Sequence, residues 1–397
     1  MMVVDDLTDE LVLSFIQDSK HFRELEKDKK VSKITTTVLS EEGYLSVVYN
    51  AVITFSDETQ FSFIIKRISV ARYLKSFSLA EEKSNLELLA NYHNRECQVY
   101  ELLSKTSTVA PRLYAAKPAI DVSKDPGYIL MESFVGRASV LGVFTATTDQ
   151  HCLNVARQLG KLRAEVAAVP FEEYSDWNDP FRIDADMVQS LLDQHLQSLL
   201  DYDNELFAPL VEKLKPYANR NSYNYLLKTR AVELGVASLT HADLHGSNMI
   251  AKLQPDGTPS NEIVAFIDWQ TSFCGNSLFD LARFLSFSDA DTRRRVEQDA
   301  LDEYYNTYLE FTKKPNPKFT REVCQELYDL GLLMEALEWQ NLFGIVFQNF
   351  TCNNEKEKEA FKARMAVKAR FTMEDGIQAI EKYNLKDRLA NLQNGYQ

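Results

Sequence analysis

In the first third of the chain, hydrophobic residues recur at every second position, which is typical of β-strands that bury one face. Short polar turns join three such runs, and a helical stretch at residues 80–105 separates them from two more. The predicted strands are Ile34–Leu39, Tyr44–Phe55, Phe61–Ile68, Arg112–Ala116 and Tyr128–Phe134. A short helix within residues 1–30 precedes them. The pattern predicts an antiparallel sheet with one main helix.

From about residue 148 the hydrophobic period lengthens to that of α-helices. The predicted helices are His151–Ala168, Met187–Leu200, Leu206–Lys228, Phe279–Ser286, 293–312, 320–349 and 355–382. One exception is a β-hairpin, with strands Met249–Leu253 and Ile263–Ile267 around a turn rich in Pro and Gly. We therefore predict an α+β protein of two lobes. An antiparallel-sheet N-terminal lobe covers residues 1–135, and a mostly helical C-terminal lobe covers residues 136–397.

Composition narrows the possible partners. The chain has 397 residues, 45% of them hydrophobic, and a net charge of −14. This charge argues against binding nucleic acid, whose phosphates need clustered Lys and Arg. No apolar run is long enough to span a bilayer, and the N-terminus does not read as a signal peptide. Five scattered cysteines predict reduced thiols rather than disulfides. We expect a cytoplasmic protein.

The strongest chemical signal is the segment from His241 to Asn248, followed by Asp268 at the end of the predicted hairpin. Phosphoryl transfer needs one carboxylate at the attacking hydroxyl and oxygen ligands for the Mg²⁺ ions that bridge the phosphates. An Asp-x-x-x-x-Asn loop before a hairpin that ends in Asp supplies these groups. This pattern predicts Asp243 as the catalytic base and Asn248 with Asp268 as metal ligands.

The same residues also admit a simpler interpretation. Asp and Asn are common in turns and helix caps, so each one alone would be unremarkable. Their joint spacing around a strand–turn–strand favours a phosphotransferase site. We expect His241 to hold the loop by side-chain hydrogen bonds, whereas His245 either contacts substrate or is solvated. A zinc site from these two histidines is not expected, because their spacing suits a helix and the segment is not helical.

Several segments resemble known phosphotransferases. The loop Leu239–Leu244 resembles the Brenner motif of aminoglycoside phosphotransferases and choline kinases, and more narrowly the catalytic loop of the ecdysteroid kinase-like (CHK kinase-like) family. Val264–Gln270 is similar to the family's metal-binding strand end, and Asn276–Ala282 to the segment where an aspartate, here Asp280, braces the catalytic loop. The likeness covers roughly residues 35–350. It implies a protein-kinase-like fold that uses ATP and Mg²⁺ to phosphorylate a small-molecule hydroxyl.

The N-terminal half fits the same resemblance. Gly43, Tyr44 and Ser46 lie in a segment that looks like the family's phosphate-covering hairpin, although a plain β-turn explains a single glycine equally well. Lys66 ends a strand where an ammonium would reach the α- and β-phosphates. Glu96 is similar to the helix glutamate that pairs with that lysine. Taken alone, either charge would be an ordinary solvated side chain.

The strand from Tyr128 resembles the strand that leads into the interlobe hinge. Kinase-like folds hold adenine there by backbone groups, so the carbonyl of Glu132 and the N–H of Phe134 are the expected contacts. Two positions depart from the family. Arg163 stands where relatives often carry histidine, and His245 replaces a frequent aromatic residue. Neither change removes a group that phosphoryl transfer needs.

The acceptor should lie between the catalytic loop and the helices at 180–235 and 320–382. Aromatic residues in the C-terminal helices predict mainly core, with some lining an apolar cavity suited to a steroid-like or glycosylated metabolite. They are Tyr304, Tyr305, Tyr308, Phe311, Tyr328, Trp339, Phe343, Phe347 and Phe350. One alternative is a choline or ethanolamine kinase, with Trp339, Glu335 and Glu338 around the ammonium. Another is an inactive nucleotide-binding scaffold.

Overall fold

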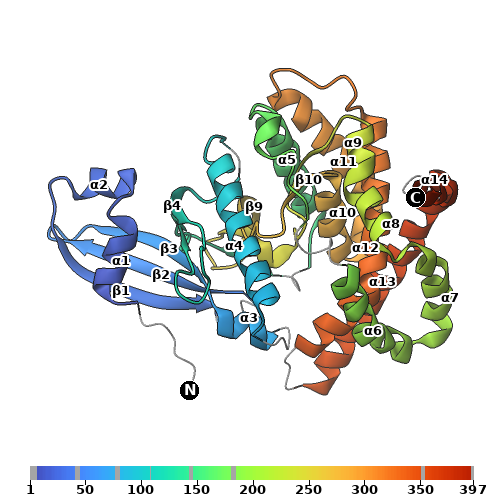
Figure 1. Cartoon of the computed structure of the whole chain (residues 1–397), viewed down its shortest axis with the longest axis horizontal. Helices are drawn as coiled ribbons and strands as arrows, with labels where there is room; N and C mark the ends of the chain where they lie inside the picture. The colour runs from blue at the N-terminus through green and yellow to red at the C-terminus, as the bar shows by residue number, and fades with distance from the viewer. Residues whose placement is uncertain are drawn as a thin grey trace. The chain divides into compact units, whose positions relative to one another are not determined.

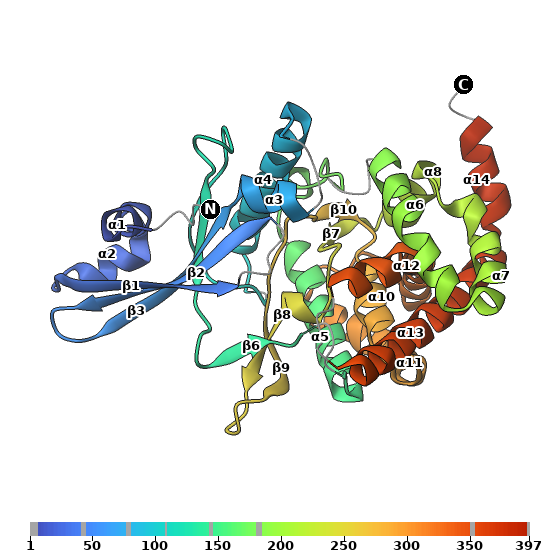
Figure 2. The ribbon, with the colours of Figure 1, turned by 90° about the horizontal axis from the view of Figure 1, so that it is seen from below.

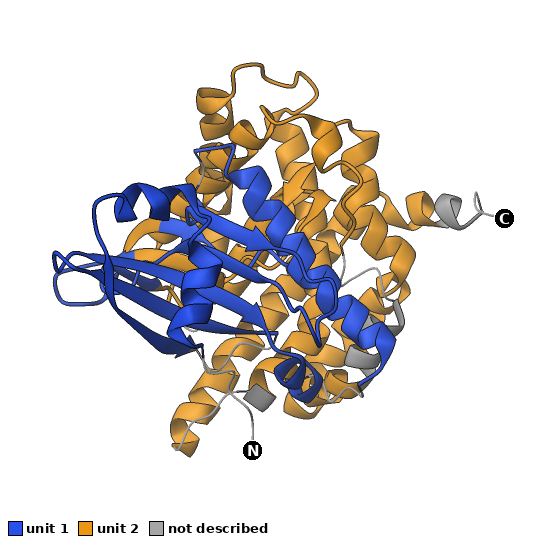
Figure 3. Ribbon diagram, turned by 60° about the vertical axis from the view of Figure 1, so that its left-hand side comes forward, with its two compact units in different colours: residues 1–139, 252–259, 264–270 blue, residues 140–251, 260–263, 271–397 orange. Residues whose placement is uncertain are grey.

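The computed structural model describes residues 7–40, 45–76, 81–107, 109–142, 146–179, 185–349 and 354–394. The chain divides into two compact units (Figure 3). Unit 1 comprises Met1–Ser139, Lys252–Pro259 and Val264–Gln270, and unit 2 comprises the remaining residues. The sequence analysis assigned Lys252–Pro259 and Val264–Gln270 to the C-terminal lobe. Asp268 therefore belongs to unit 1, whereas Asp243 and Asn248 belong to unit 2.

Unit 1 is built around a five-stranded sheet in the order β1-β2-β3-β5-β4 (Figure 1). Every neighbouring pair in it is antiparallel. The strands are β1 Val31–Ser40, β2 Ser46–Phe55, β3 Gln60–Ile68, β4 Leu113–Lys117 and β5 Tyr128–Glu132. All five predicted strands are present. The prediction of an antiparallel N-terminal sheet is confirmed.

In the described part of unit 1, four helices accompany this sheet: α1 Asp9–Ile16, α2 Lys20–Glu26, α3 Val70–Ser76 and α4 Lys83–Leu103. The main helix predicted at 80–105 is α4. The short helix predicted within residues 1–30 is present as α1, and a second helix, α2, follows it, because the backbone at Ser19 is extended and separates the two. Helix α3 was not predicted.

The two faces of β3 meet different neighbours. Phe61, Phe63 and Ile65 share a hydrophobic core with residues of α1 and α2. Side chains alternate along a strand, so Lys66 points to the opposite face. There it meets Glu96 of α4. The alternation of β3 thus selects which helix the lysine can reach.

The turn before β5 requires glycine. Gly127 has φ of +72°, and a Cβ placed on it would lie 2.3 Å from the carbonyl oxygen of Lys117 and 2.7 Å from Nε2 of His93. A side chain is therefore excluded both by backbone conformation and by lack of space. This turn delivers the chain into β5 beside β4 and β3.

Unit 2 is mainly helical. Its helices are α5 Asp149–Val166, α6 Ala185–Tyr202, α7 Asn204–Leu214, α8 Arg220–Asn224, α9 Arg230–Glu233, α10 Leu278–Phe287, α11 Ala290–Phe311, α12 Arg321–Asn349, α13 Glu355–Lys382 and α14 Leu385–Asn394. The continuous helix predicted over Leu206–Lys228 is broken. Pro216 follows the end of α7, and a π-helical turn occupies Tyr225–Thr229.

Helix α12 packs against α6, α10 and α13 (Figure 2). Leu333, Trp339 and Phe343 of α12 are fully buried in the core that these helices share. Tyr304 and Tyr308 of α11 and Tyr328 of α12 are buried as well. These aromatic residues belong to the core, which was the more strongly favoured interpretation. Phe350 lies outside the described residues.

Short strands lie on both sides of the loop from His241 to Asn248. β7 Ser238–Thr240 pairs with β10 Phe273–Gly275, and a second sheet has the order β6-β8-β9. The strands of that sheet are β6 Ala138–Val140, β8 Met249–Leu253 and β9 Pro259–Phe266. The predicted hairpin is thus present as β8 and β9, while β6, β7 and β10 were not predicted. No helix in the described part of the chain is long and apolar enough to cross a membrane.

Candidate active site

The segment between β7 and β8 is held by the carboxylate of Asp280, at the start of α10. Its Oδ2 accepts a hydrogen bond from the backbone N–H of His241, and its Oδ1 accepts one from the N–H of Ala242, each at 2.8 Å. Ala242 has φ of +73°, a conformation that L-residues avoid. Asp280 is itself buried. The carboxylate therefore stabilises a backbone path that would otherwise be unfavourable, in the bracing position that the family resemblance implies.

His241 stabilises the same loop from within. Its ring is fully buried, and Nδ1 accepts a hydrogen bond of 3.3 Å from the N–H of Asp243. Its carbonyl oxygen accepts a 3.2 Å bond from the hydroxyl of Thr271. The structure places this histidine in the loop interior, where its contacts are of the kind expected for a residue that holds the loop.

Asp243 is paired with an arginine that the sequence analysis did not identify. Nε and Nη2 of Arg283, on α10, donate to Oδ1 of Asp243 at 3.1 and 2.8 Å. Burial alone would raise the pKa of the Asp243 carboxyl, but the positive charge of Arg283 and the nearby His245 and His241 outweigh it and hold that pKa below its usual range. Asp243 is therefore ionised across the physiological range.

Asn248 lies directly beside Asp243. Its Nδ2 donates to the backbone carbonyl of Asp243 at 2.9 Å and lies 3.5 Å from Oδ2 of that residue. The amide nitrogen faces Asp243, so the amide oxygen points away from it. Nε2 of His245 lies 3.8 Å from Oδ2 of Asp243, and its ring lies beside Phe287 at 5.7 Å between centroids. His245 is thus packed beside the loop and only partly exposed.

A second cluster lies within unit 1. Nζ of Lys66 lies 2.8 Å from Oε1 and 2.7 Å from Oε2 of Glu96, and 2.5 Å from Oδ1 of Asp268. Burial alone would lower the pKa of Lys66, but the two carboxylates raise it above its ordinary value. Burial raises the pKa of Glu96 to about 7, against the opposing effect of Lys66. One ammonium therefore holds two carboxylates from a helix and from the end of a hairpin.

The remaining N-terminal predictions have separate positions. Ser46 begins β2 opposite Ile68 and is buried. Gly43 and Tyr44 lie outside the described residues. Glu132 ends β5 and forms an ion pair with Arg137, while the carbonyl of Phe134 accepts from the N–H groups of Arg137 and Ala138 at 3.1 and 2.9 Å. The chain thus turns directly after β5.

Arg163, one of the two departures from the family, has structural contacts. Arg163 is buried in unit 2, donating to Oγ of Ser277 at 2.6 Å and to the carbonyl of Val236 at 2.7 Å. Its guanidinium lies 3.6 Å from the centroid of Phe319. The ring centroid of Tyr308 lies 5.7 Å from the guanidinium. These contacts place Arg163 in the interior of the helical unit, so the histidine position of the family is filled here by a packing residue.

The choline cage considered from the sequence does not form. Trp339 and Glu335 are fully buried, and Nε1 of Trp339 donates to Oγ of Ser286. Glu335 and Glu338 each accept a hydrogen bond from Nη1 of Arg283, at 2.9 and 2.6 Å. The carboxylates proposed to meet an ammonium ligand are therefore already hydrogen-bonded to a guanidinium.

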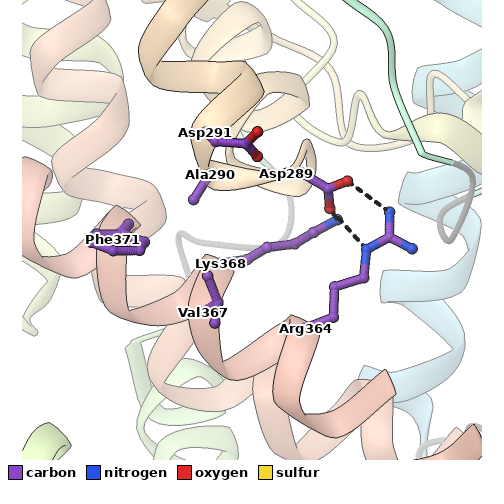
Figure 4. Close-up of a pocket in the computed structure, with 7 residues that line it drawn as sticks. All are labelled: Asp289, Ala290, Asp291, Arg364, Val367, Lys368 and Phe371. Atoms are coloured by element: carbon purple, nitrogen blue, oxygen red, sulfur yellow. Dashed lines mark hydrogen bonds and ion pairs between the residues drawn. The ribbon is translucent and has the colours of Figure 1, made fainter. Parts of the chain in front are cut away.

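A pocket of unit 2 lies between the start of α11 and α13. It has a volume of about 330 Å³ and is lined by Asp289, Arg364 and Lys368, among others (Figure 4). Nε of Arg364 donates to Asp289 at 2.8 Å, and Nζ of Lys368 donates to the carbonyl of Phe287 at 2.5 Å. Burial lowers the pKa of Lys368 to about 8. None of the predicted site residues lines this pocket.

The residues present fit Mg²⁺ and a nucleotide chemically. Asp268 already binds a cationic group, the ammonium of Lys66, through Oδ1. The amide oxygen of Asn248 faces away from Asp243, because its Nδ2 donates to that residue. A carboxylate and a carbonyl oxygen are ligands that Mg²⁺ prefers. Lys66, held on the sheet by Glu96, supplies the positive charge that phosphates require.

These groups are the ones on which protein-kinase-like phosphotransferases depend. Such proteins pair a lysine of the third strand with a glutamate of the following main helix, and they carry an Asp and an Asn in a catalytic loop before a metal-binding aspartate. This chain has the same order of elements as those proteins, with the antiparallel sheet of unit 1 first and the helices of unit 2 after it. The fold is protein-kinase-like, as predicted.

The family follows from the sequence. A family model, DUF1679, described as "Uncharacterized oxidoreductase dhs-27", matches residues 59–385, so the chain belongs to this family. This assignment confirms the predicted relationship to the ecdysteroid kinase-like family. The word oxidoreductase in this description refers to the protein dhs-27, after which the family model is described. A search of curated proteins finds no significant match.

Solved structures with a similar arrangement include a putative aminoglycoside phosphotransferase from Ralstonia eutropha JMP134. It has 12% sequence identity and a TM-score of 0.47, and the match covers 91% of this chain and 97% of that one. The amicoumacin kinase hAmiN in complex with AMP-PNP, Ca²⁺ and Ami has 14% identity and a TM-score of 0.47, with 91% and 96% covered. The kinase-like class is supported by the elements and contacts described above rather than by these likenesses.

Proposed function

We propose that the protein is an ATP-dependent phosphotransferase that moves the γ-phosphate of ATP to a hydroxyl group of a small molecule. The observation that carries this proposal is the ammonium of Lys66 between the carboxylates of Glu96 and Asp268. Burying a lysine with two carboxylates costs desolvation free energy that their pairing often does not exceed, so such a cluster is not explained by stability alone. In phosphoryl transfer it fixes the phosphates beside the metal.

The catalytic loop supplies the acceptor side of the reaction. Asp243 would receive the hydrogen of the acceptor hydroxyl, and Asn248 and Asp268 would each offer an oxygen ligand to Mg²⁺. Asn248 immediately precedes β8. Asp268 follows β9, which is the neighbour of β8 in the same sheet. His241 and Asp280 keep the loop in shape. Bound Mg·ATP supplies the phosphoryl group, whose bond to the leaving ADP breaks as the hydroxyl oxygen attacks phosphorus.

The nucleotide side is assigned to unit 1. Lys66 contacts the α- and β-phosphates, with Glu96 orienting its ammonium. Gly43 and Tyr44, which lie outside the described residues, and Ser46 at the start of β2 are assigned to the phosphates by the family resemblance. The adenine ring is held by the backbone carbonyl of Glu132 and the N–H of Phe134. These roles extend the family resemblance residue by residue.

The acceptor class is proposed from the family rather than from the aromatic residues. The buried positions of Tyr304, Tyr328 and Trp339 remove the main sequence-based reason for an aromatic-lined cavity. Resemblance to the ecdysteroid kinase-like family still favours a small lipophilic alcohol, steroid-like or glycosylated. Choline is disfavoured because Glu335 and Glu338 are bonded to Arg283.

An oxidoreductase activity has no comparable support. The dinucleotide-binding fingerprint Gly-x-Gly-x-x-Gly does not occur in the sequence. Dinucleotide-binding folds place that fingerprint in a mostly parallel sheet. The five-stranded sheet of unit 1 is antiparallel throughout. We therefore do not extend the oxidoreductase activity named in the family description to this chain.

Nucleotide binding is the first test. Mg·ATP at about 100 times its Kd should stabilise the protein by about 2.7 kcal/mol, visible as a thermal shift. Asp268→Ala should abolish that shift. Asp256→Ala is the matched control, because Asp256 lies in the turn of the same hairpin. Its Oδ1 accepts hydrogen bonds from the backbone N–H and the hydroxyl of Thr258. A wild-type protein that shows no shift with Mg·ATP contradicts the proposal.

Transfer is the second test. Labelled ATP and a panel of steroid alcohols, glycosides, aminoglycosides, choline and ethanolamine would identify the acceptor class. Asp243→Asn should lower turnover on the order of 10²–10⁴-fold while leaving the Mg·ATP thermal shift in place. Unchanged turnover in this variant would show that Asp243 does not serve the reaction.

A further inference from the structure

Arg283 makes four hydrogen bonds from a buried position on α10. Two of them, from Nε and Nη2, end on the same atom, Oδ1 of Asp243. The other two run from Nη1 to Glu335 at 2.9 Å and to Glu338 at 2.6 Å. The Arg283 side chain is only 7% exposed. The guanidinium therefore joins the catalytic loop to α12 through fixed directions.

The two oxygens of Asp243 are not equivalent as a result. Oδ1 is occupied by the guanidinium, whereas the contacts of Oδ2 with the described residues are longer, 3.5 Å to Nδ2 of Asn248 and 3.8 Å to Nε2 of His245. We propose that Arg283 is a positioning residue that fixes Oδ1 of Asp243, so that Oδ2 is the atom that receives the acceptor hydroxyl. This inference rests on the proposed phosphotransferase function.

The arginine is itself held in place. Oε2 of Glu335 accepts a 2.7 Å hydrogen bond from Oγ of Ser286, one helical turn from Arg283 on the same helix. The guanidinium lies 5.4 Å from the ring centroid of Phe287. Because its donors lie in one rigid plane, fixing Nη1 on α12 also fixes the direction of Nε and Nη2. A lysine has a single flexible ammonium and cannot reproduce this arrangement.

Helix α10 thereby controls the loop twice. Asp280 and Arg283 are three residues apart, so they lie on the same side of the helix. Asp280 fixes the backbone of His241 and Ala242. Arg283 fixes the side chain that follows, Asp243. The loop backbone and the reactive carboxylate are thus oriented from one rigid element.

Arg283→Lys is the test variant, because it keeps the positive charge and loses the planar pair of donors. A misplacement of the reacting carboxylate on the order of 1 Å costs about 100-fold in turnover. We expect kcat to fall about 10- to 100-fold, with KM for ATP within about twofold of wild type, since no nucleotide contact is assigned to Arg283. Turnover is measured as transfer of labelled phosphate to the best acceptor of the panel, and to water as a second acceptor.

Arg293→Lys is the matched control. Arg293 is equally buried and lies in the same unit on α11, and its Nη2 donates to Oδ2 of Asp375 at 2.6 Å. Its replacement should lower stability to a similar extent and leave kcat unchanged. Where Arg283→Lys folds poorly, Glu338→Gln serves instead, because it loosens one support of the guanidinium. It should lower kcat several-fold at constant KM.

A double-mutant cycle separates positioning from general support. In the Asp243→Asn background, Arg283→Lys should change residual turnover by less than about twofold. Asparagine carries an NH₂ group in place of Oδ2, so the carboxylate oxygen that Arg283 orients is no longer present. Equal kcat in Arg283→Lys and wild type overturns the inference, as does the same loss in both backgrounds. If residual turnover falls below detection, the comparison of kcat and KM with Arg293→Lys decides alone. An inactive wild type would instead contradict the proposed function.

Discussion

Replacement of Asp280 by asparagine should release the catalytic loop. The Asp280 carboxylate is buried and accepts two backbone N–H bonds, from His241 and Ala242, both at 2.8 Å. Asparagine keeps one acceptor oxygen and turns an NH₂ group toward the second N–H. A buried donor that loses its partner costs about 1–3 kcal/mol. The left-handed conformation of Ala242, which costs roughly 1–2 kcal/mol, loses part of its support at the same time.

We therefore expect Asp280→Asn to lower the free energy of unfolding of unit 2 by about 2–4 kcal/mol. Urea unfolding followed by tryptophan emission measures this, because Trp177 and Trp339 are both buried in unit 2. Asp203→Asn is the matched control. Asp203 accepts a single backbone N–H, from Leu206, as the N-cap of α7. Asparagine caps equally well, so that change should stay below about 0.5 kcal/mol. Equal losses in the two variants would refute the reasoning.

Two further predictions concern unit 1. Burial lowers the pKa of His93 to about 4, from 6.5, so the unfolded chain binds more protons between these values. The contribution of His93 to stability is complete above pH 6.5 and is lost as the pH drops toward 4, by up to about 3 kcal/mol, whereas Glu96, with its raised pKa, contributes in the opposite direction. His93→Gln should remove the His93 contribution, so urea midpoints of the variant should rise relative to wild type as the pH drops, and an unchanged slope would contradict the assignment. Gly127→Ala should cost about 2–4 kcal/mol, because a Cβ there lies 2.3 Å from the Lys117 carbonyl. Gly257→Ala, with similar φ and no atom within 4 Å, should lose only about 1 kcal/mol; equal midpoints for the two variants would show that crowding is unimportant.

The strands of unit 1 were predictable because their hydrophobic period is two and their turns are polar. The helix breaks were less so. The chain interrupts its first helix at Gln17–Ser19 without a proline or glycine. The interruption after α7 did carry a local signal, since Pro216 has no N–H to donate within a helix. Local propensity located elements, whereas tertiary packing decided where several of them end.

The chemistry of the loop was predictable from spacing, and its support was not. Asp243, Asn248 and Asp268 are separated by short, regular segments, so the sequence shows them as a set. Arg283 lies 40 residues beyond Asp243 and 52 before Glu335. No local pattern joins such partners. One signal was available, an arginine inside the apolar helix Leu278–Phe287, three residues after Asp280.

The contact between Lys66 and Asp268 has a consequence for the order of binding. On the proposed function, a free metal ion meets a carboxylate that is already paired with an ammonium 2.5 Å away. A triphosphate competes for that ammonium and so exposes the carboxylate to the ion. Nucleotide and metal should therefore each increase the affinity of the protein for the other by the same factor. The lysine acts as an exchangeable counter-ion, and the enzyme should select the preformed metal–nucleotide complex over either component alone.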